Sequence, residues 1–269
     1  MGYRSAVRSS EWIACLYFLY VAICAWIRRL PAGRRLALTA ICLAAAGAVW
    51  WNGHAVSPIL RDWSPLATIL LGYYVSGALF VEPSLATEAW LMAWDRRLLG
   101  DPSTRFAAWP RPLVGFLEVI YMGCFVLIGL GFVILWLAGQ AALADRYWTM
   151  VVGAELGAFA PLAFIQTRPP WALERKPVLA DPVIHDVSLR MNRYFTIHVN
   201  TFPSGHVAGS LAVALAVLTA MPLAGTILLL FSLAITLGCI VGRYHYVIDA
   251  VTGALLAIAI AAATMTALG

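Results

Sequence analysis

Two apolar stretches near the C-terminus decide the fold, and each of them begins with polar residues. Residues 203–220 read PSGHVAGSLAVALAVLTA, and residues 245–268 read HYVIDAVTGALLAIAIAAATMTAL. Each run is close to the length of a membrane helix, since a bilayer needs about 20 apolar residues. The polar residues therefore fall at helix starts, where unpaired backbone N–H groups and the positive end of the helix dipole favour a bound anion. Two such starts near one another would form a site suited to phosphate.

The overall composition excludes an ordinary soluble domain. Hydrophobic residues make up 62% of the 269 residues, charged residues make up 12%, and the mean hydropathy is +0.84. These values are typical of an all-α, polytopic membrane protein that folds as a transmembrane helical bundle. We expect about eight spans, and the apolar segments that would supply them are residues 11–27, 36–51, 64–81, 114–138, 149–166, 204–220, 223–242 and 246–268.

The first two apolar segments are short for full spans. They form either two transmembrane helices or a hairpin of tilted, partial spans. In both cases we expect an N-terminal membrane hairpin over residues 1–58 and a six-helix core over residues 59–269.

Only two long polar stretches interrupt the apolar segments, at residues 82–112 and 167–203. Within the first, residues 84–99 mix Trp, Leu and charged side chains between the helix breakers Pro83 and Gly100, which predicts an interfacial helix. This helix is either an amphipathic connector or a lid over the substrate. The second stretch has four prolines before position 183, so it cannot be one continuous helix. A loop of this length beside a polar helix start is typical of a functional segment.

The first polar helix start contains Ser204, Gly205 and His206. Serine is a favoured N-cap residue, and the glycine leaves the backbone amides open to an anion. The serine hydroxyl can also donate a hydrogen bond. His206 would lie in the first helical turn, close enough to such an anion to give a proton to a departing alkoxide. The alternative is a histidine with a structural role only.

The second polar helix start places His245 and Asp249 four residues apart, on one helical face. The carboxylate can accept one ring N–H and leave the other ring nitrogen as a nucleophile. A carboxylate within an apolar span is costly without a partner, which favours a functional pair over a purely structural one. Arg243 lies just before this pair, and together with Arg168 it could clamp a phosphoryl group from two sides.

These residues can support phosphoryl transfer through a phosphohistidine. His245 would attack phosphorus, Asp249 would orient it, and His206 would protonate the leaving oxygen. The charge on the equatorial oxygens would be held by Arg168, Arg243, Ser204 and the Gly205 amide. The sequence lacks the carboxylate cluster that a Mg²⁺ site requires, so we expect neither a metal ion nor a cofactor.

At these positions the chain resembles the type-2 phosphatidic acid phosphatase superfamily. That family has a basic segment ending in Arg-Pro, a Pro-Ser-Gly-His sequence, and a His followed four residues later by Asp. This chain has Arg168 with Pro169, the stretch 203–206, and His245 with Asp249. The resemblance covers residues 60–268 by layout and implies an integral-membrane enzyme acting on a lipid phosphate.

The chain also departs from the family pattern. The lysine that usually precedes the motif's arginine is absent before Arg168, and Lys176 follows it instead, which makes Lys176 a further candidate for phosphate binding. Cys239 occupies the place of a usual arginine, and Arg243 is its candidate replacement. Residues 243–249 are most similar to the branch that contains inositol phosphorylceramide synthases and sphingomyelin synthases. The acceptor of the phosphoryl group therefore stays open.

Four functions remain at this point. The first is a metal-independent lipid phosphate phosphatase acting on a phosphatidate, a prenyl phosphate or a similar lipid. The second is a lipid phosphotransferase that moves a phospho-headgroup onto a lipid hydroxyl. The third is a proton-coupled transporter that uses His206, His245 and Asp249 as a relay, and the fourth is a membrane scaffold. The expected partners are the lipid substrate and membrane lipids, with no nucleic acid.

We expect a multi-pass protein of the cell (inner) membrane, with two possible orientations. The loops after the first and third segments hold eight arginines, against four on the opposite side, which favours a cytoplasmic site. The family resemblance implies a site that faces away from the cytoplasm in many members. Both orientations stay open.

Overall fold

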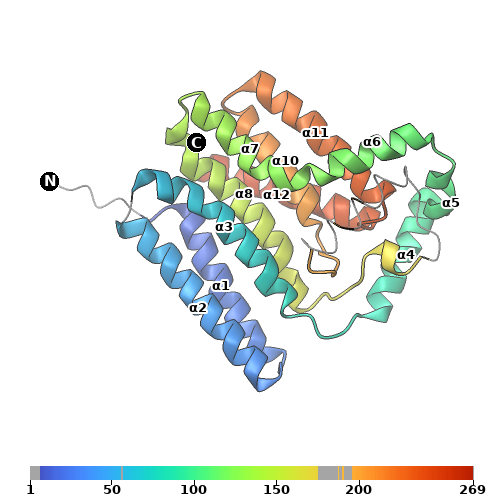
Figure 1. Ribbon diagram of the computed structural model, residues 1–269, viewed down its shortest axis with the longest axis horizontal. Coiled ribbons are helices and arrows are strands. Elements are labelled where there is room, and N and C mark those ends of the chain that lie inside the picture. Colours follow the sequence, from blue (N-terminus) through green and yellow to red (C-terminus); the bar gives the residue numbers. More distant parts are fainter. Residues whose placement is uncertain (1–6, 56, 175–186, 188–189, 191–195, 269) are drawn as a thin grey trace.

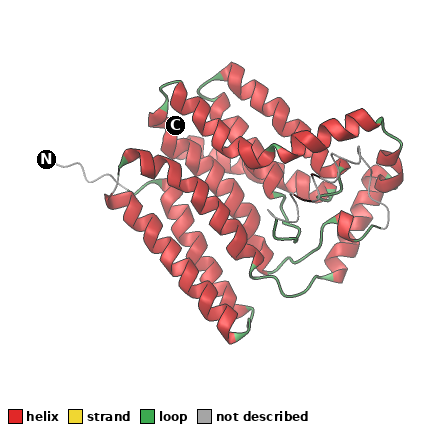
Figure 2. Ribbon diagram, in the orientation of Figure 1, coloured by secondary structure: helices red, strands yellow, loops and turns green. Residues whose placement is uncertain are grey.

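The structure is a computed structural model that describes residues 7–55, 57–174, 187, 190 and 196–268. Within these residues it is a helical bundle without a β-strand, which confirms the all-α prediction (Figures 1 and 2). The α-helices are α1 (Ser9–Ile27), α2 (Ala32–Ala55), α3 (Pro58–Gly77), α4 (Leu85–Leu99), α5 (Pro102–Ala107), α6 (Arg111–Met122), α7 (Cys124–Leu137), α8 (Ala144–Phe159), α10 (Gly205–Leu218), α11 (Pro222–Val241) and α12 (Val247–Leu268). The 3₁₀ helices are η1 (Ala141–Leu143), η2 (Ala160–Ala163) and η3 (Pro170–Ala172).

Every apolar segment that the sequence singled out contains a helix, but fewer helices than expected can span a membrane alone. Among the described residues, α1, α2, α11 and α12 are long and apolar enough, and α6 with α7 makes a fifth span if that bent pair is counted as one. The two helices of this pair meet at Gly123 with a bend of 58°. The helices α8 and α10 have only 16 and 14 residues. The eight predicted spans therefore correspond to helices of unequal length, and the short ones belong to the interior of the bundle.

Helix α10 lies at the centre of the bundle and packs against α7, α8, α11 and α12 (Figure 1). Small residues make this possible, because they let neighbouring helices approach closely. A Cβ atom added to Gly225 of α11 would lie 2.2 Å from the Leu218 Cα at the end of α10. A Cβ atom added to Gly253 of α12 would lie 2.6 Å from the carbonyl oxygen of Ser204. The two glycines fix α11 and α12 tightly against opposite ends of α10.

The N-terminal helices α1 and α2 form a hairpin whose first helix packs on α3 and α8. Polar contacts fasten it to the core. Glu11 of α1 forms a buried ion pair with Arg61 of α3, in which the guanidinium Nη2 is 2.6 Å from Oε2. The Tyr20 hydroxyl of α1 donates to the carbonyl oxygen of Ala160 at 2.8 Å. The hairpin thus docks on the core mainly through α1, while α2 also contacts α3, and the division of the chain at residue 58 stays a prediction.

The polar stretch after α3 forms α4, which agrees with the helix predicted over residues 84–99. Ser84 caps its N-terminus by accepting a hydrogen bond from the Thr87 amide at 3.3 Å, and Gly100 ends it with a φ of 76°. The buried residues of α4 are Glu88, Leu91 and Asp95, whose spacing places them on one face. This face points two carboxylates at the rest of the protein. The placement of α4 at the membrane surface and its use as a lid stay predictions.

Candidate active site

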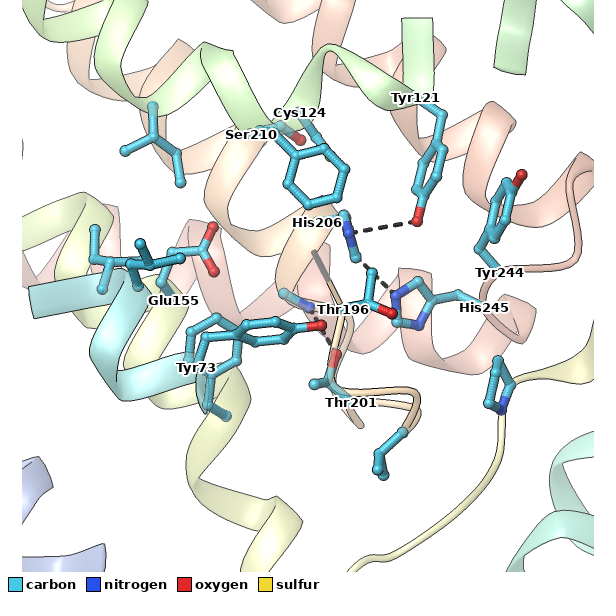
Figure 3. A pocket seen from close by; sticks show the side chains of 18 of the residues that line it. Tyr73, Tyr121, Cys124, Glu155, Thr196, Thr201, His206, Ser210, Tyr244 and His245 are labelled. Carbon is cyan, nitrogen blue, oxygen red and sulfur yellow. Dashed lines mark hydrogen bonds between the residues drawn. The ribbon is translucent and has the colours of Figure 1, made fainter. Parts of the chain in front are cut away.

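A cavity of about 460 Å³ lies among α3, α6, α7, α8 and α10 (Figure 3). Much of its wall is apolar, and the aliphatic and aromatic side chains that form it include Leu66, Ile69, Leu70, Phe125, Ile128 and Phe159. His206 and His245 both line the cavity, although 39 residues separate them in the sequence. The structure therefore brings the two predicted imidazoles into one pocket.

The starts of α10 and α12 touch through the backbone, which explains why the histidines meet. The Ser204 amide donates to the carbonyl oxygen of Asp249 at 2.9 Å. Gly253, one turn further along α12, leaves the space that the backbone of Ser204 occupies. A side chain at position 253 would push the two helix starts apart, so the closeness of His206 to His245 depends on a residue that has no polar group.

A chain of hydrogen bonds runs through the two rings. His245 Nδ1 is 3.4 Å from Asp249 Oδ2, which also accepts the Tyr246 amide at 3.0 Å. His245 Nε2 is 3.1 Å from His206 Nδ1, and His206 Nε2 is 3.5 Å from the Tyr121 hydroxyl. One assignment of protons satisfies every contact: His245 Nδ1–H donates to Asp249, His206 Nδ1–H donates to His245 Nε2, and the Tyr121 O–H donates to His206 Nε2. His245 Nε2 then carries a lone pair, as a nucleophile must.

The electrostatic surroundings favour an uncharged His245. Burial lowers the pKa of His245 to about 3, because an imidazolium ion is poorly solvated away from water. The His245 side chain is 5% exposed. At neutral pH the imidazole is therefore unprotonated at Nε2, and this nitrogen is available for nucleophilic attack.

Ser204 and Gly205 occupy the helix start that the sequence predicted. The Ser204 side chain is the N-cap of α10 and accepts a hydrogen bond from the Val207 amide at 3.4 Å. The Gly205 amide donates to Thr201 Oγ1 at 3.2 Å, and Gly205 lines the cavity. Both groups already have partners within the protein. Their binding of a phosphate stays a prediction, and it requires the Gly205 amide to exchange Thr201 for the ligand.

Arg168 lies near the cavity but does not line it. Its guanidinium forms two hydrogen bonds with Glu88 of α4, at 3.0 Å from Nε to Oε1 and 2.8 Å from Nη2 to Oε2. Burial would raise the pKa of Glu88, but the hydrogen bonds from Arg168 outweigh it and lower that pKa. The Arg168 side chain is 40% exposed. It can therefore reorient, and its role in phosphate binding stays a prediction.

Arg243 faces a different cavity from the one that contains the histidines. The residue has a φ of 59°, in the left-handed region, so the chain turns sharply between its side chain and His245. Its guanidinium is buried between Asp95, at 2.8 Å, and Glu174, at 2.6 Å. In this arrangement Arg243 neutralises two carboxylates and ties α4 to the segment before α12. Its contact with a phosphoryl group stays a prediction, and Lys176 lies outside the described residues.

The cavity also contains polar residues that the sequence reasoning did not select. Tyr244 stacks on Tyr121 with ring centroids 4.1 Å apart and donates from its hydroxyl to Glu118 at 2.8 Å. Glu155 of α8 enters the cavity from the side opposite His245 (Figure 3). A signal for Glu155 was present, because a carboxylate within an apolar stretch is costly and commonly functional. Nothing in the sequence marks the stacked tyrosines.

The fold and the site together define a class: a multi-pass helical membrane protein with a histidine pair and a carboxylate at one end of an apolar cavity. The family model described as the PAP2 superfamily matches residues 89–263, from α4 to α12. The chain therefore belongs to the PAP2 superfamily, and it is a phosphoryl-transfer enzyme in the broad sense of that family. No curated protein and no solved structure matches it in the same comparisons. The match includes every site residue named above except Glu88 of α4 and those contributed by α3.

Proposed function

We propose that the protein is a metal-independent lipid phosphate phosphatase of the cell (inner) membrane that works through a phosphohistidine at His245. The observation that carries this proposal is the hydrogen-bond chain from Asp249 through His245 to His206 at one end of an apolar cavity. Such a cavity suits the hydrocarbon part of a lipid, whose phosphate would then reach the histidines. The substrate class is a phosphatidate, a prenyl phosphate or a similar lipid phosphate.

In the first step, His245 Nε2 attacks phosphorus and the bond from phosphorus to the ester oxygen breaks. Asp249 stabilises the positive charge that the ring of His245 gains. His206 is neutral in the described structure and takes up a proton at Nε2 when the anionic phosphate binds beside it, and it then gives this proton to the leaving oxygen. The products are a free alcohol and a phosphohistidine.

In the second step, water replaces the alcohol. The neutral His206 accepts a proton from water as the water oxygen attacks phosphorus, the bond from nitrogen to phosphorus breaks, and inorganic phosphate leaves. His245 regains its lone pair, and His206 is ready for another cycle. Both steps use the same pair of rings in opposite protonation roles.

Substrate binding has to open several contacts of the described structure. The 3.1 Å contact between His206 and His245 leaves no room for a phosphoryl group between them, so these rings must separate. Arg168 must exchange Glu88 for phosphate if it is to hold the equatorial oxygens. The proposal keeps Arg168, Arg243, Lys176, Ser204 and Gly205 as phosphate-binding residues. It requires Arg243 to leave Asp95 and Glu174, and the Gly205 amide to leave Thr201.

A lipid phosphotransferase is the second candidate, because the apolar cavity can also supply a lipid hydroxyl as the acceptor. It would use the same phosphorus chemistry with an alcohol in place of water. The superfamily match favours either enzyme over the transporter and the scaffold.

Purified protein with a panel of labelled lipid phosphates tests the proposal. In the presence of EDTA, we expect wild type to release inorganic phosphate, and we expect His245→Ala and His206→Ala to lose this release. His54→Ala is a matched control, because His54 is exposed on α2, and its contacts among the described residues are with the carbonyl oxygen and the ring of Trp50. Accumulation of a new phosphate ester in place of inorganic phosphate would establish the transferase. Wild-type turnover by both cavity variants would refute the assignment of nucleophile and acid.

A further inference from the structure

Glu155 is a buried carboxyl group that the proposed mechanism does not use. It lies on α8, it is 6% exposed, and it lines the same cavity as His206 and His245. Among the described residues, neither of its oxygens has a hydrogen-bond or ion-pair partner. Figure 3 shows the carboxyl group extending into the cavity toward His206.

The first turn of α10 is shaped around this carboxyl group. A Cβ atom added to Gly209 would lie 1.7 Å from Glu155 Oε1, and one added to Gly205 would lie 3.3 Å from Oε2. Two glycines four residues apart thus leave a space on one face of α10, which the carboxyl group shares with the ring of Phe159, whose Cε1 would lie 2.7 Å from a Cβ atom at position 205. The space places the carboxyl group beside the turn that contains His206.

A buried carboxyl group without a partner is costly, and the cost disappears when a ligand supplies a hydrogen-bond donor. The lining of the cavity includes the hydroxyl groups of Tyr73, Thr201 and Ser210, but among the described residues none of them donates to Glu155, so the occupant of the cavity can supply the donor. Since the phosphate of that occupant would be at the histidines, the donor would lie a few bonds from the phosphate ester.

We propose that Glu155 accepts a hydrogen bond from a hydroxyl or amino group that the lipid substrate carries close to its phosphate ester, and thereby selects such lipids. This proposal rests on the proposed function, because it takes the histidines as the phosphate end of the site. It assigns Glu155 to specificity and not to the phosphorus chemistry.

Three synthetic substrates test the proposal: hexadecyl phosphate, and its derivatives with either a hydroxyl or an amino group on the carbon next to the ester carbon. We expect wild type to have a kcat/KM roughly 10-fold higher for a derivative than for the parent, as one hydrogen bond to a buried carboxyl group can supply. Glu155→Leu should lose this preference and still release phosphate from hexadecyl phosphate.

Gly209→Ala is a second variant, which keeps the Glu155 side chain but moves its carboxyl group. Its added methyl group would collide with Glu155 Oε1, so the preference should fall as it does in Glu155→Leu. Gly157→Ala on α8 is the matched control, because its methyl group would meet only Leu256 at ordinary distances of 3.5 Å or more. This control should keep the wild-type preference.

The outcomes separate this proposal from the proposed function. Phosphate release by wild type without a preference would overturn the role of Glu155 and leave the phosphatase standing. A preference that survives in both Glu155→Leu and Gly209→Ala would overturn it as well. If Glu155→Leu does not fold, the test depends on Gly209→Ala alone, in which the ratio of kcat/KM for a derivative to kcat/KM for hexadecyl phosphate should be lower than in wild type. Release from none of the three substrates overturns the role of Glu155, and the panel of natural lipid phosphates then decides the proposed function separately.

Discussion

Asp249→Asn is the most informative single substitution in the site. The side chain is fully buried, and its Oδ2 atom accepts from both His245 Nδ1 and the Tyr246 amide. Asparagine keeps one oxygen for the amide but presents an N–H₂ group to the ring or loses the contact. His245 then favours the other tautomer, in which Nε2 carries the proton and cannot attack. We expect kcat to fall about 10⁴-fold, by analogy with the loss of the orienting carboxylate in a serine protease triad, which is about 5.4 kcal/mol of transition-state stabilisation.

Two measurements on purified Asp249→Asn check this expectation. Phosphate release gives kcat, and rapid quenching of a reaction with radiolabelled lipid phosphate shows whether the acid-labile phosphohistidine forms. Thermal unfolding in the same detergent tests whether the fold survives. Asp101→Asn is the control, because Asp101 is exposed and bonds to Thr104 in its own turn. A kcat within about tenfold of wild type, with the fold intact, would refute the role of Asp249 in orienting the nucleophile.

Three further predictions follow from the structure. Arg168→Ala should lower kcat/KM about 100-fold, as expected for loss of one charged phosphate contact, and an unchanged kcat/KM in the phosphate-release assay would remove Arg168 from the site. The pKa of His245 is about 3 in the folded protein and about 6.5 in an unfolded chain. Between pH 6.5 and pH 3 the unfolded chain therefore binds a proton at this residue that the folded chain does not bind. The stability of the wild-type protein should therefore fall from pH 6.5 toward pH 3, and it should fall less steeply in His245→Gln. If wild type and His245→Gln show the same slope of melting temperature against pH, the buried, neutral ring is contradicted. Gly253→Ala should destabilise the protein by about 1–3 kcal/mol through overpacking, and it should reduce turnover by separating the starts of α10 and α12. The control Gly157→Ala should do neither. A wild-type melting temperature for Gly253→Ala would contradict the close packing.

Local features of the sequence determined the helices and the candidate site residues. Apolar segments of nearly bilayer length located the helices of the bundle, because hydrophobic burial depends on the composition of each segment. Ser204 predicted the start of α10, since an N-cap acts on the amides two or three residues later. The spacing of His245 and Asp249 predicted their contact, but not its geometry, because His245 lies two residues before the start of α12 and reaches Asp249 from the turn that leads into the helix.

Only the tertiary structure decided which of the polar groups share the cavity. Arg243 is two residues from His245, yet its positive φ and its ion pairs with Asp95 and Glu174 turn it into another cavity. Those carboxylates are 148 and 69 residues away, and no local pattern links them to the arginine. Glu155 meets the first turn of α10 for the same kind of reason: a gap left by two glycines on one helix receives a side chain from another. Local periodicity determines where helices begin and which face is polar, but contacts between distant residues depend on how closely the packed helices approach one another.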